Sequence, residues 1–158
     1  MVAEVPPSYG DMTSAKVWMQ TLERPEPEQI AAYLEAEAWE RRVDKFRVSQ
    51  SIPGMAVLGL NDAAFALLDE AMQRVPAERL WCMWNGNNNG PGTEQLFLPV
   101  VAGLQADPRF LPLCHRLGLC RYWLESGQWP DFIVDSPRRF ALEAEVRALA
   151  TDEGAPTI

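Results

Sequence analysis

The stretch Asp107–Phe132, DPRFLPLCHRLGLCRYWLESGQWPDF, holds the clearest secondary-structure signals in the chain. Asp107 and Pro108 form a helix start, because an aspartate caps free backbone N–H groups and proline suits the first helical turn. Gly118 suits the left-handed conformation that ends many helices. We therefore predict one helix from Asp107 to Gly118 and a second over residues 119–126. Apolar residues at helical spacing predict the buried face of the first helix: Phe110, Leu111, Cys114 and Leu117.

The same pairing of a capping residue with proline recurs near the C-terminus. Ser136 and Pro137 predict the start of a final helix that runs to about Ala150. Trp-Pro-Asp-Phe at 129–132 is expected to close the end of the helical stack, since a solenoid needs a cover for its core. The apolar face of the final helix is expected to contain Phe140, Leu142, Val146 and Leu149.

Helical periodicity also dominates the rest of the sequence. Pro53 and Gly54 are expected to interrupt it, Asn61 and Asp62 to cap one helix, and Thr93 to cap another. The expected helices upstream of Asp107 cover residues 13–22, 27–49, 61–75, 77–83 and 94–105. The apolar residues expected to be buried in the last of these are Leu96, Phe97, Val100, Val101 and Leu104.

These patterns predict an all-α fold built of antiparallel helical hairpins. Alternating apolar and polar runs, which are typical of strands, are almost absent. The chain of 158 residues is long enough for one domain with a real core. We expect a flexible lead over residues 1–12, a single helical domain over 13–150 and a flexible tail over 151–158.

Two parts of the chain resemble bacterial tetratricopeptide-repeat (TPR) proteins. Residues 58–65, LGLNDAAF, are similar to the turn inside a repeat, and Ala64, Leu68, Ala71 and Pro76 follow at the spacings of its second helix. The Asp-Pro-Arg-Phe, Gly-Leu and Pro-Asp-Phe series resembles the segment after the last repeat. The resemblance covers less than a third of the chain. It implies a short TPR-like α-solenoid with C-terminal capping helices and a noncatalytic role in binding a protein or peptide.

Composition excludes several classes of function. The formal net charge is −8 and the isoelectric point is near 4.7, so the chain lacks the basic surface that nucleic-acid binding needs. No apolar run reaches the length of a membrane span. The N-terminal residues 1–12 show no secretion signal, and we therefore expect a cytoplasmic protein.

The titratable residues give little support for catalysis or metal binding. Cys82, Cys114 and Cys120 are too few and too scattered for a disulfide framework, and with His115 they match no standard zinc spacing. His115 is the only histidine, and its neighbour Cys114 should point about 100° away around the helix. We expect buried thiols, no cofactor and no catalytic residue, so an enzyme is the least favoured of the function classes.

An asparagine-rich loop over residues 81–92 is one candidate binding site. Tryptophans and amides together can bind a peptide or a sugar, although the same composition also suits a long turn whose tryptophans pack in the core. The alternative function is therefore a small-ligand-binding helical domain that uses this loop. The candidate contact residues are Trp81, Trp84, Asn85, Asn87 and Asn88.

Arginines in the C-terminal part of the chain form a second candidate site. Arg109 and Arg116 are seven residues apart and should share a helix face, where they could recognise a carboxylate together with Arg121, Arg138 and Arg139. Self-association is a further possibility, because the two ends of a short helical stack are apolar. The acidic residues near enough in sequence to neutralise these arginines instead are Asp107, Glu125, Asp131 and Asp135.

Overall fold

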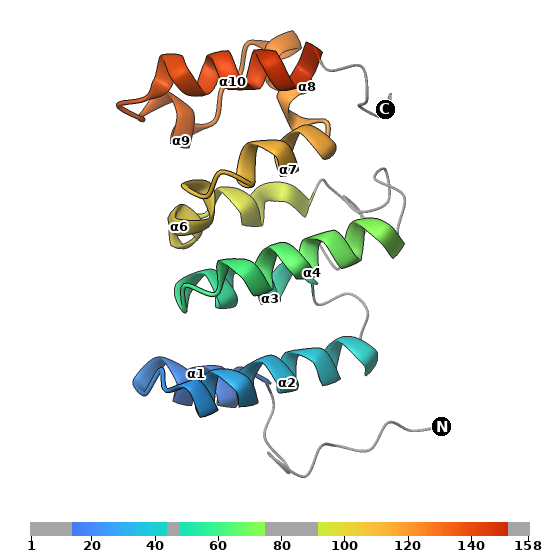
Figure 1. Ribbon diagram of the computed structural model, residues 1–158, viewed down its shortest axis with the longest axis vertical. Helices are drawn as coiled ribbons and strands as arrows, with labels where there is room; N and C mark the ends of the chain where they lie inside the picture. The colour runs from blue at the N-terminus through green and yellow to red at the C-terminus, as the bar shows by residue number, and fades with distance from the viewer. Residues whose placement is uncertain (1–13, 44–47, 75–91, 152–158) are drawn as a thin grey trace.

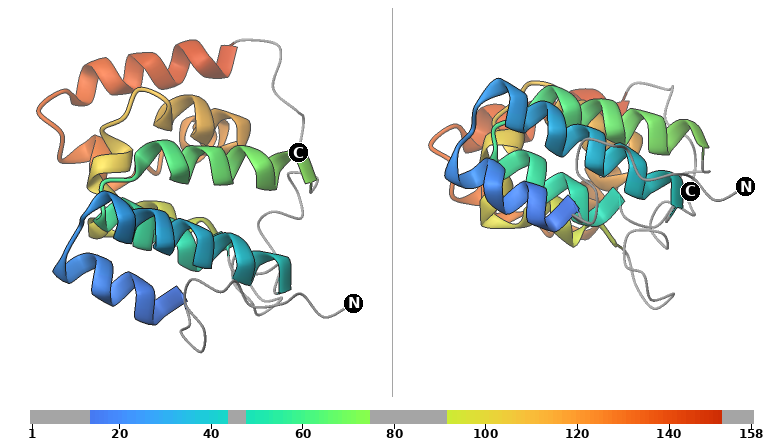
Figure 2. Two further views of the ribbon diagram at one scale, coloured as in Figure 1. Left: turned by 60° about the horizontal axis from the view of Figure 1, so that its bottom comes forward. Right: turned by 90° about the horizontal axis from the view of Figure 1, so that it is seen from below.

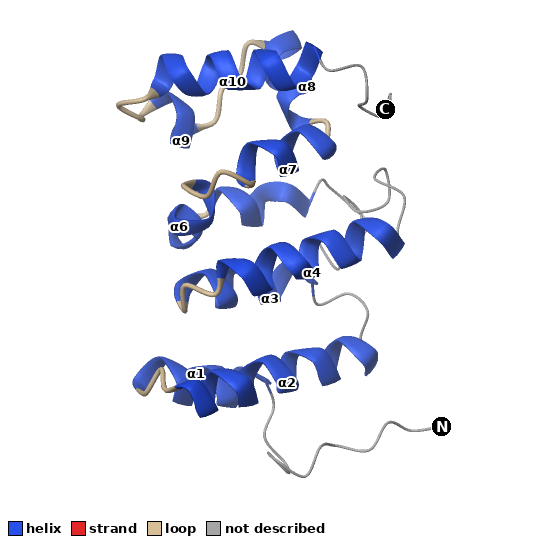
Figure 3. Cartoon of the chain, in the orientation of Figure 1, coloured by secondary structure: helices blue, strands red, loops and turns tan. Residues whose placement is uncertain are grey.

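A computed structural model describes residues 14–43, 48–74 and 92–151 of the chain. In this described part all regular secondary structure is helical, joined by short loops and with no strand, which confirms the all-α prediction (Figure 3). The predicted helix 77–83, the asparagine-rich residues up to Pro91, the lead 1–12 and residues 152–158 lie outside it. None of the described helices is long and apolar enough to cross a membrane.

The helices stack in layers along the long axis of the molecule (Figure 1). The N-terminal helices form one end of the stack and the C-terminal helices form the other, while neighbouring layers follow one another in chain order (Figures 1 and 2). The elements are α1 (Ser14–Glu23), α2 (Pro27–Val43), α3 (Val48–Val57), α4 (Asn61–Arg74), the 3-10 helices η1 (Gly92–Phe97) and η2 (Pro99–Val101), α6 (Ala102–Gln105), α7 (Phe110–Arg116), α8 (Leu119–Ser126), α9 (Asp131–Val134) and α10 (Arg139–Thr151).

The first layer is a hairpin of α1 and α2, which pack along each other. The sequence predicted both helices. The second was expected to run to Ser49, but α2 ends at Val43 and a separate helix, α3, begins at Val48. Trp18 ties the hairpin to the next layer by donating a hydrogen bond from Nε1 to the carbonyl of Gly54, at 3.2 Å. Tyr33 of α2 is fully buried at the same place.

The predicted interruption at Pro53 and Gly54 is wrong, because α3 continues through both residues. A proline inside a helix removes one backbone hydrogen bond and disfavours the helix. Packing outweighs this cost here, since Ile52 and Met55 on the same helix are almost completely buried. Glycine suits position 54, because an added Cβ would lie 2.8 Å from the Tyr33 hydroxyl oxygen and that buried side chain would have to shift.

A tight turn joins α3 to α4. Gly59 adopts a left-handed φ of 69°, and the N–H groups of Gly59 and Leu60 donate to the carbonyls of Ala56 and Met55. This is the Schellman arrangement, which satisfies carbonyl groups that a helix end leaves free. The predicted Asn61 cap is wrong: Asn61 is already helical, and its Nδ2 donates to the Gly103 carbonyl at 3.2 Å.

Residues 92–105 form a broken helical segment instead of the predicted continuous helix. Leu98 is extended, as residues before proline usually are, and Pro99 then begins a new 3-10 turn. The break rotates Val100 outward, and its side chain is 49% exposed although the sequence predicted burial. Leu96, Val101 and Leu104 are buried as expected.

The C-terminal helices agree closely with the sequence prediction. Gly118 and Gly127 adopt left-handed φ values of 75° and 69°, and α8 ends at Ser126. Helix α7 begins at Phe110, slightly later than predicted, because Asp107 first caps a turn by accepting a hydrogen bond from the N–H of Arg109. The predicted face of α7 is buried, with Phe110, Leu111, Cys114 and Leu117 in the core.

Aromatic rings join the C-terminal layers. Phe132 of α9 lies 5.3 Å from Phe110, 6.1 Å from Trp123 and 6.2 Å from Phe97 between ring centroids. The predicted burial of Phe140 is wrong, since this side chain is 84% exposed. Residues two apart on a helix point about 200° apart, so the inward-facing Leu142 leaves Phe140 on the outer face.

Candidate functional site

Arg109 and Arg116 lie on one face of α7, as predicted, and both point towards α4. Arg109 Nη2 lies 2.8 Å from Asp62 Oδ1, and Arg116 Nη1 lies 2.5 Å from Asp69 Oδ1. The two acidic residues are also seven residues apart, so the two ion pairs match along the helices. These arginines therefore link α7 to α4 and are already paired within the chain.

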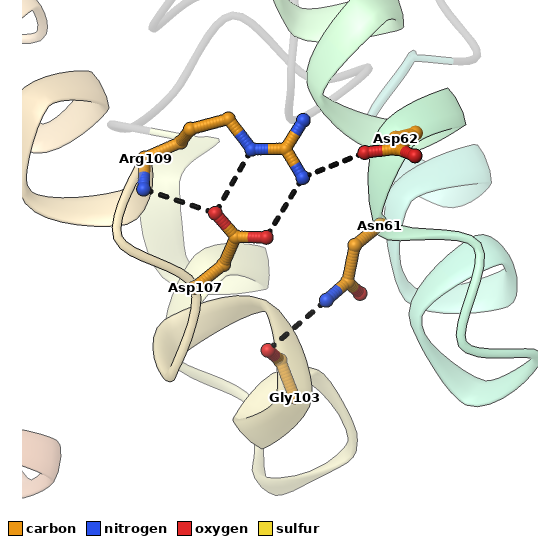
Figure 4. A network of polar contacts seen from close by, with 5 residues as sticks. All are labelled: Asn61, Asp62, Gly103, Asp107 and Arg109. Atoms are coloured by element: carbon orange, nitrogen blue, oxygen red, sulfur yellow. Dashed lines mark hydrogen bonds and ion pairs between the residues drawn. The ribbon is translucent and has the colours of Figure 1, made fainter.

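Arg109 is the centre of a polar network (Figure 4). Its Nε and Nη2 donate to Asp107, and its guanidinium lies 4.3 Å from the centre of the Phe65 ring. The hydrogen bonds from the Arg109 side chain and N–H lower the pKa of Asp107 to about 2. The sequence predicted that Asp107 could pair with Arg109, because the two residues are close in the chain. It did not predict the ion pair between Arg109 and Asp62.

Asp107 also lines a groove of about 430 Å³ between the α6–α7 corner and α10. Leu111 and Phe132 form apolar parts of its lining, and Leu142 of α10 adds a third. Ala102 and Ala106 are small and exposed on the facing wall, which leaves room for an added chain. The other lining residues are Gln105, Asp107, Pro108, Ser136, Arg138 and Glu145.

Two charged side chains line this groove without an ion-pair partner among the described residues: Arg138, which directly precedes α10, and Glu145 of α10. Arg138 stands at the start of α10 and Glu145 stands seven residues later, and both are exposed. The third charge in the lining, on Asp107, is neutralised because both carboxylate oxygens accept hydrogen bonds from Arg109. Within the described part of the chain, the groove thus combines an apolar floor with one cation and one anion that have no ion-pair partner.

The local sequence explains how α10 presents these groups. The Ser136 hydroxyl accepts a hydrogen bond from the N–H of Arg138, and the N–H of Leu142 donates to the Arg138 carbonyl. Arg138 therefore directly precedes α10, and the i, i+4, i+7 spacing lets residues 138, 142 and 145 line the groove together. Sequence reasoning named Arg138 among the arginines but missed Glu145. The i, i+4, i+7 spacing of Arg138, Leu142 and Glu145 could have indicated that Glu145 shares a face with Arg138.

The described residues show no arrangement suited to nucleophilic catalysis. Burial raises the pKa of the Cys120 thiol to about 12 and holds the pKa of Cys114 well above its usual range. Both cysteines are free and buried in the described core, as predicted. No group of three or more potential metal ligands occurs among the residues described, and His115 is not part of the groove lining.

The predicted loop contacts Trp81, Trp84, Asn85, Asn87 and Asn88 lie outside the described residues. They remain a separate candidate site. The predicted contact residues within the described part of the chain, Arg109 and Arg116, lie on one face and both pair with α4. No protein-family model matches the chain, and comparisons with curated proteins and with solved structures gave no match.

Proposed function

We propose that this chain is a noncatalytic, TPR-like protein-binding module that holds a peptide segment of a partner protein in the groove beside α10. One observation carries the proposal. The groove sets an apolar floor of Leu111, Phe132 and Leu142 beside the unpaired charges of Arg138 and Glu145. Such a combination suits a peptide, because apolar side chains supply binding energy while polar groups fix the position.

The stacked helices support the same proposal. A layered helical scaffold offers an elongated surface along a helix, and helical-repeat proteins use such surfaces to bind extended partners. The lining of this groove follows α10 over two turns from Arg138 to Glu145. A ligand that occupies this length is better matched by a peptide than by a compact small molecule.

Peptide-display selection on the wild-type protein tests the proposal. Ala106→Trp fills the groove from its wall, and because Ala106 is exposed the substitution removes no core contact. Ala144→Trp is the matched control, since Ala144 is exposed on α10 but does not line the groove. We expect selected peptides to bind wild type and Ala144→Trp equally, and Ala106→Trp at least about tenfold more weakly, the loss that about 1.4 kcal/mol produces.

Two results would count against the proposal. Selection could give no enriched peptide, or the enriched peptides could bind Ala106→Trp as tightly as wild type. In the second case the binding surface would lie elsewhere, and substitution of Trp81 and Trp84 by alanine would test the loop instead. A melting shift with small molecules, but no peptide binding, would favour the alternative of a small-ligand-binding domain.

A further inference from the structure

From the two unpaired charges of the groove, we infer that it selects peptides that carry an acidic and a basic residue about 10 Å apart. The acidic residue lies against Arg138 and the basic residue lies against Glu145. This inference rests on the proposed function, and it adds the charge pattern of the partner and its orientation along α10.

The spacing follows from helix geometry. Arg138 and Glu145 are seven residues apart, and a helix rises about 1.5 Å per residue, so their attachment points are about 10 Å apart along α10. A peptide in the polyproline II conformation advances about 3.1 Å per residue with three residues per turn, so residues i and i+3 of the ligand lie on one side and about 9 Å apart. The expected motif is therefore an acidic residue and a basic residue with two residues between them.

The other charged side chain of the groove lining, Asp107, and the nearby Arg139 and Arg147 are paired within the chain and do not compete for the charges of the ligand. Asp107 is held by Arg109, and the nearby Arg139 is paired with Glu143 at 2.8 Å. Arg147 is paired with the same glutamate at 3.3 Å. Among the described residues, a ligand therefore meets one positive group without an ion-pair partner at the beginning of α10 and one such negative group two turns later.

The apolar floor lies between the two charges in sequence. Leu142 is four residues after Arg138 and three before Glu145, and Leu111 and Phe132 contribute from α7 and α9. The residues between the charged pair of the ligand should therefore include an apolar side chain. The small side chains of Ala102 and Ala106 on the facing wall allow a peptide backbone to come close.

A charge exchange within the groove tests the inference. The double variant Arg138→Glu/Glu145→Arg keeps the net charge and alters two exposed side chains. Peptides from a displayed random library are selected on wild type, synthesised and measured by fluorescence anisotropy with both proteins. We expect the wild-type ligands to contain the charged pair and to bind the double variant about tenfold more weakly, because two attractive contacts become repulsive. Exchanging the two charges in the peptide should restore binding.

The matched control is Arg121→Glu/Glu125→Arg, which exchanges an exposed ion pair of α8 outside the groove lining. This control should bind the wild-type ligands unchanged. Ligands that depend on Ala106 but lack the charged pair, or that bind the groove double variant undiminished, would overturn the inference and leave the proposed function standing. Failure to select any ligand that Ala106→Trp weakens would overturn both.

Discussion

Gly54 and Gly103 both lie within helices, yet their surroundings differ. A Cβ added at Gly54 would lie 2.8 Å from the Tyr33 hydroxyl oxygen, whereas one added at Gly103 would meet nothing within 4 Å. We predict that Gly54→Ala destabilises the fold by about 1–3 kcal/mol through overpacking. Gly103→Ala should instead stabilise it by about 0.5–1 kcal/mol, because alanine has the higher helix propensity.

Urea unfolding of both glycine variants checks this prediction. Gly103→Ala also serves as the control for the change from glycine to alanine in itself. Equal changes in the free energy of unfolding for the two variants would contradict the close contact between Gly54 and Tyr33. Helix propensity alone would then explain both changes.

Asp107 should make stability depend on pH in the acidic range. Arg109 lowers its pKa from 3.8 to about 2, so the carboxylate contributes stability above about pH 4 that is lost as the pH falls towards 2. Asp107→Asn should be less stable than wild type near neutral pH, and the difference should shrink as the pH approaches 2. Urea unfolding at several pH values measures this, with Asp135→Asn as a control outside the network. A pH-independent difference between wild type and Asp107→Asn would contradict the pairing.

At the scale of single elements, α10 shows which helix face packs inward. Val146 is fully buried, while Phe140 is 84% exposed despite its size. Phe140→Ala should change the free energy of unfolding by less than about 0.5 kcal/mol, the usual range for surface substitutions. Val146→Ala should cost about 2 kcal/mol because it removes buried methyl groups and leaves a cavity. Thermal unfolding of both variants tests this. A larger loss of stability for Phe140→Ala than for Val146→Ala would contradict the assignment of the exposed and buried faces of α10.

The elements predicted correctly are those set by local backbone chemistry. Glycine readily adopts the left-handed conformation that ends many helices, so Gly118 and Gly127 indicated the bounds of α8, although Gly54 and Gly103 lie inside helices. Helix α3 could not be predicted in this way, because its course through Pro53 depends on packing against α4, η1 and η2 and on the contacts of Trp18 and Tyr33 at Gly54. The broken segment 92–105 was missed because periodicity does not separate a continuous helix from successive short turns.

The candidate site was less predictable than the elements. The common face of Arg109 and Arg116 followed from their spacing, but Asp62 and Asp69 lie 47 residues before them in the chain. Sequence patterns give faces of single helices, while a groove forms only where α6, α7, α9 and α10 meet. That Arg138 and Glu145 have no ion-pair partner among the described residues likewise depends on which carboxylates and arginines the fold brings near.

At the scale of the whole molecule, the layers contact mainly their neighbours along the stack. The α1–α2 hairpin meets α3 through the hydrogen bond of Trp18 and through one between the Ser51 hydroxyl and the Glu37 carboxylate. The C-terminal layers are held separately, by the aromatic rings around Phe132 and by contacts of α10 with α7 and α8. Stability in such stacks is close to a sum of local terms, so different ends can open independently.

Trp18→Phe should therefore loosen one end of the molecule only. The substitution keeps an aromatic ring but removes the Nε1 donor that binds the Gly54 carbonyl. Loss of one such hydrogen bond costs about 1 kcal/mol, so amide exchange in α1 and α2 should become about fivefold faster. Exchange in α7 and α8, measured by mass spectrometry on the same sample, should stay unchanged and serves as the internal control. Equal acceleration at both ends would show one cooperative unit, in which the C-terminal groove depends on the N-terminal hairpin for its stability.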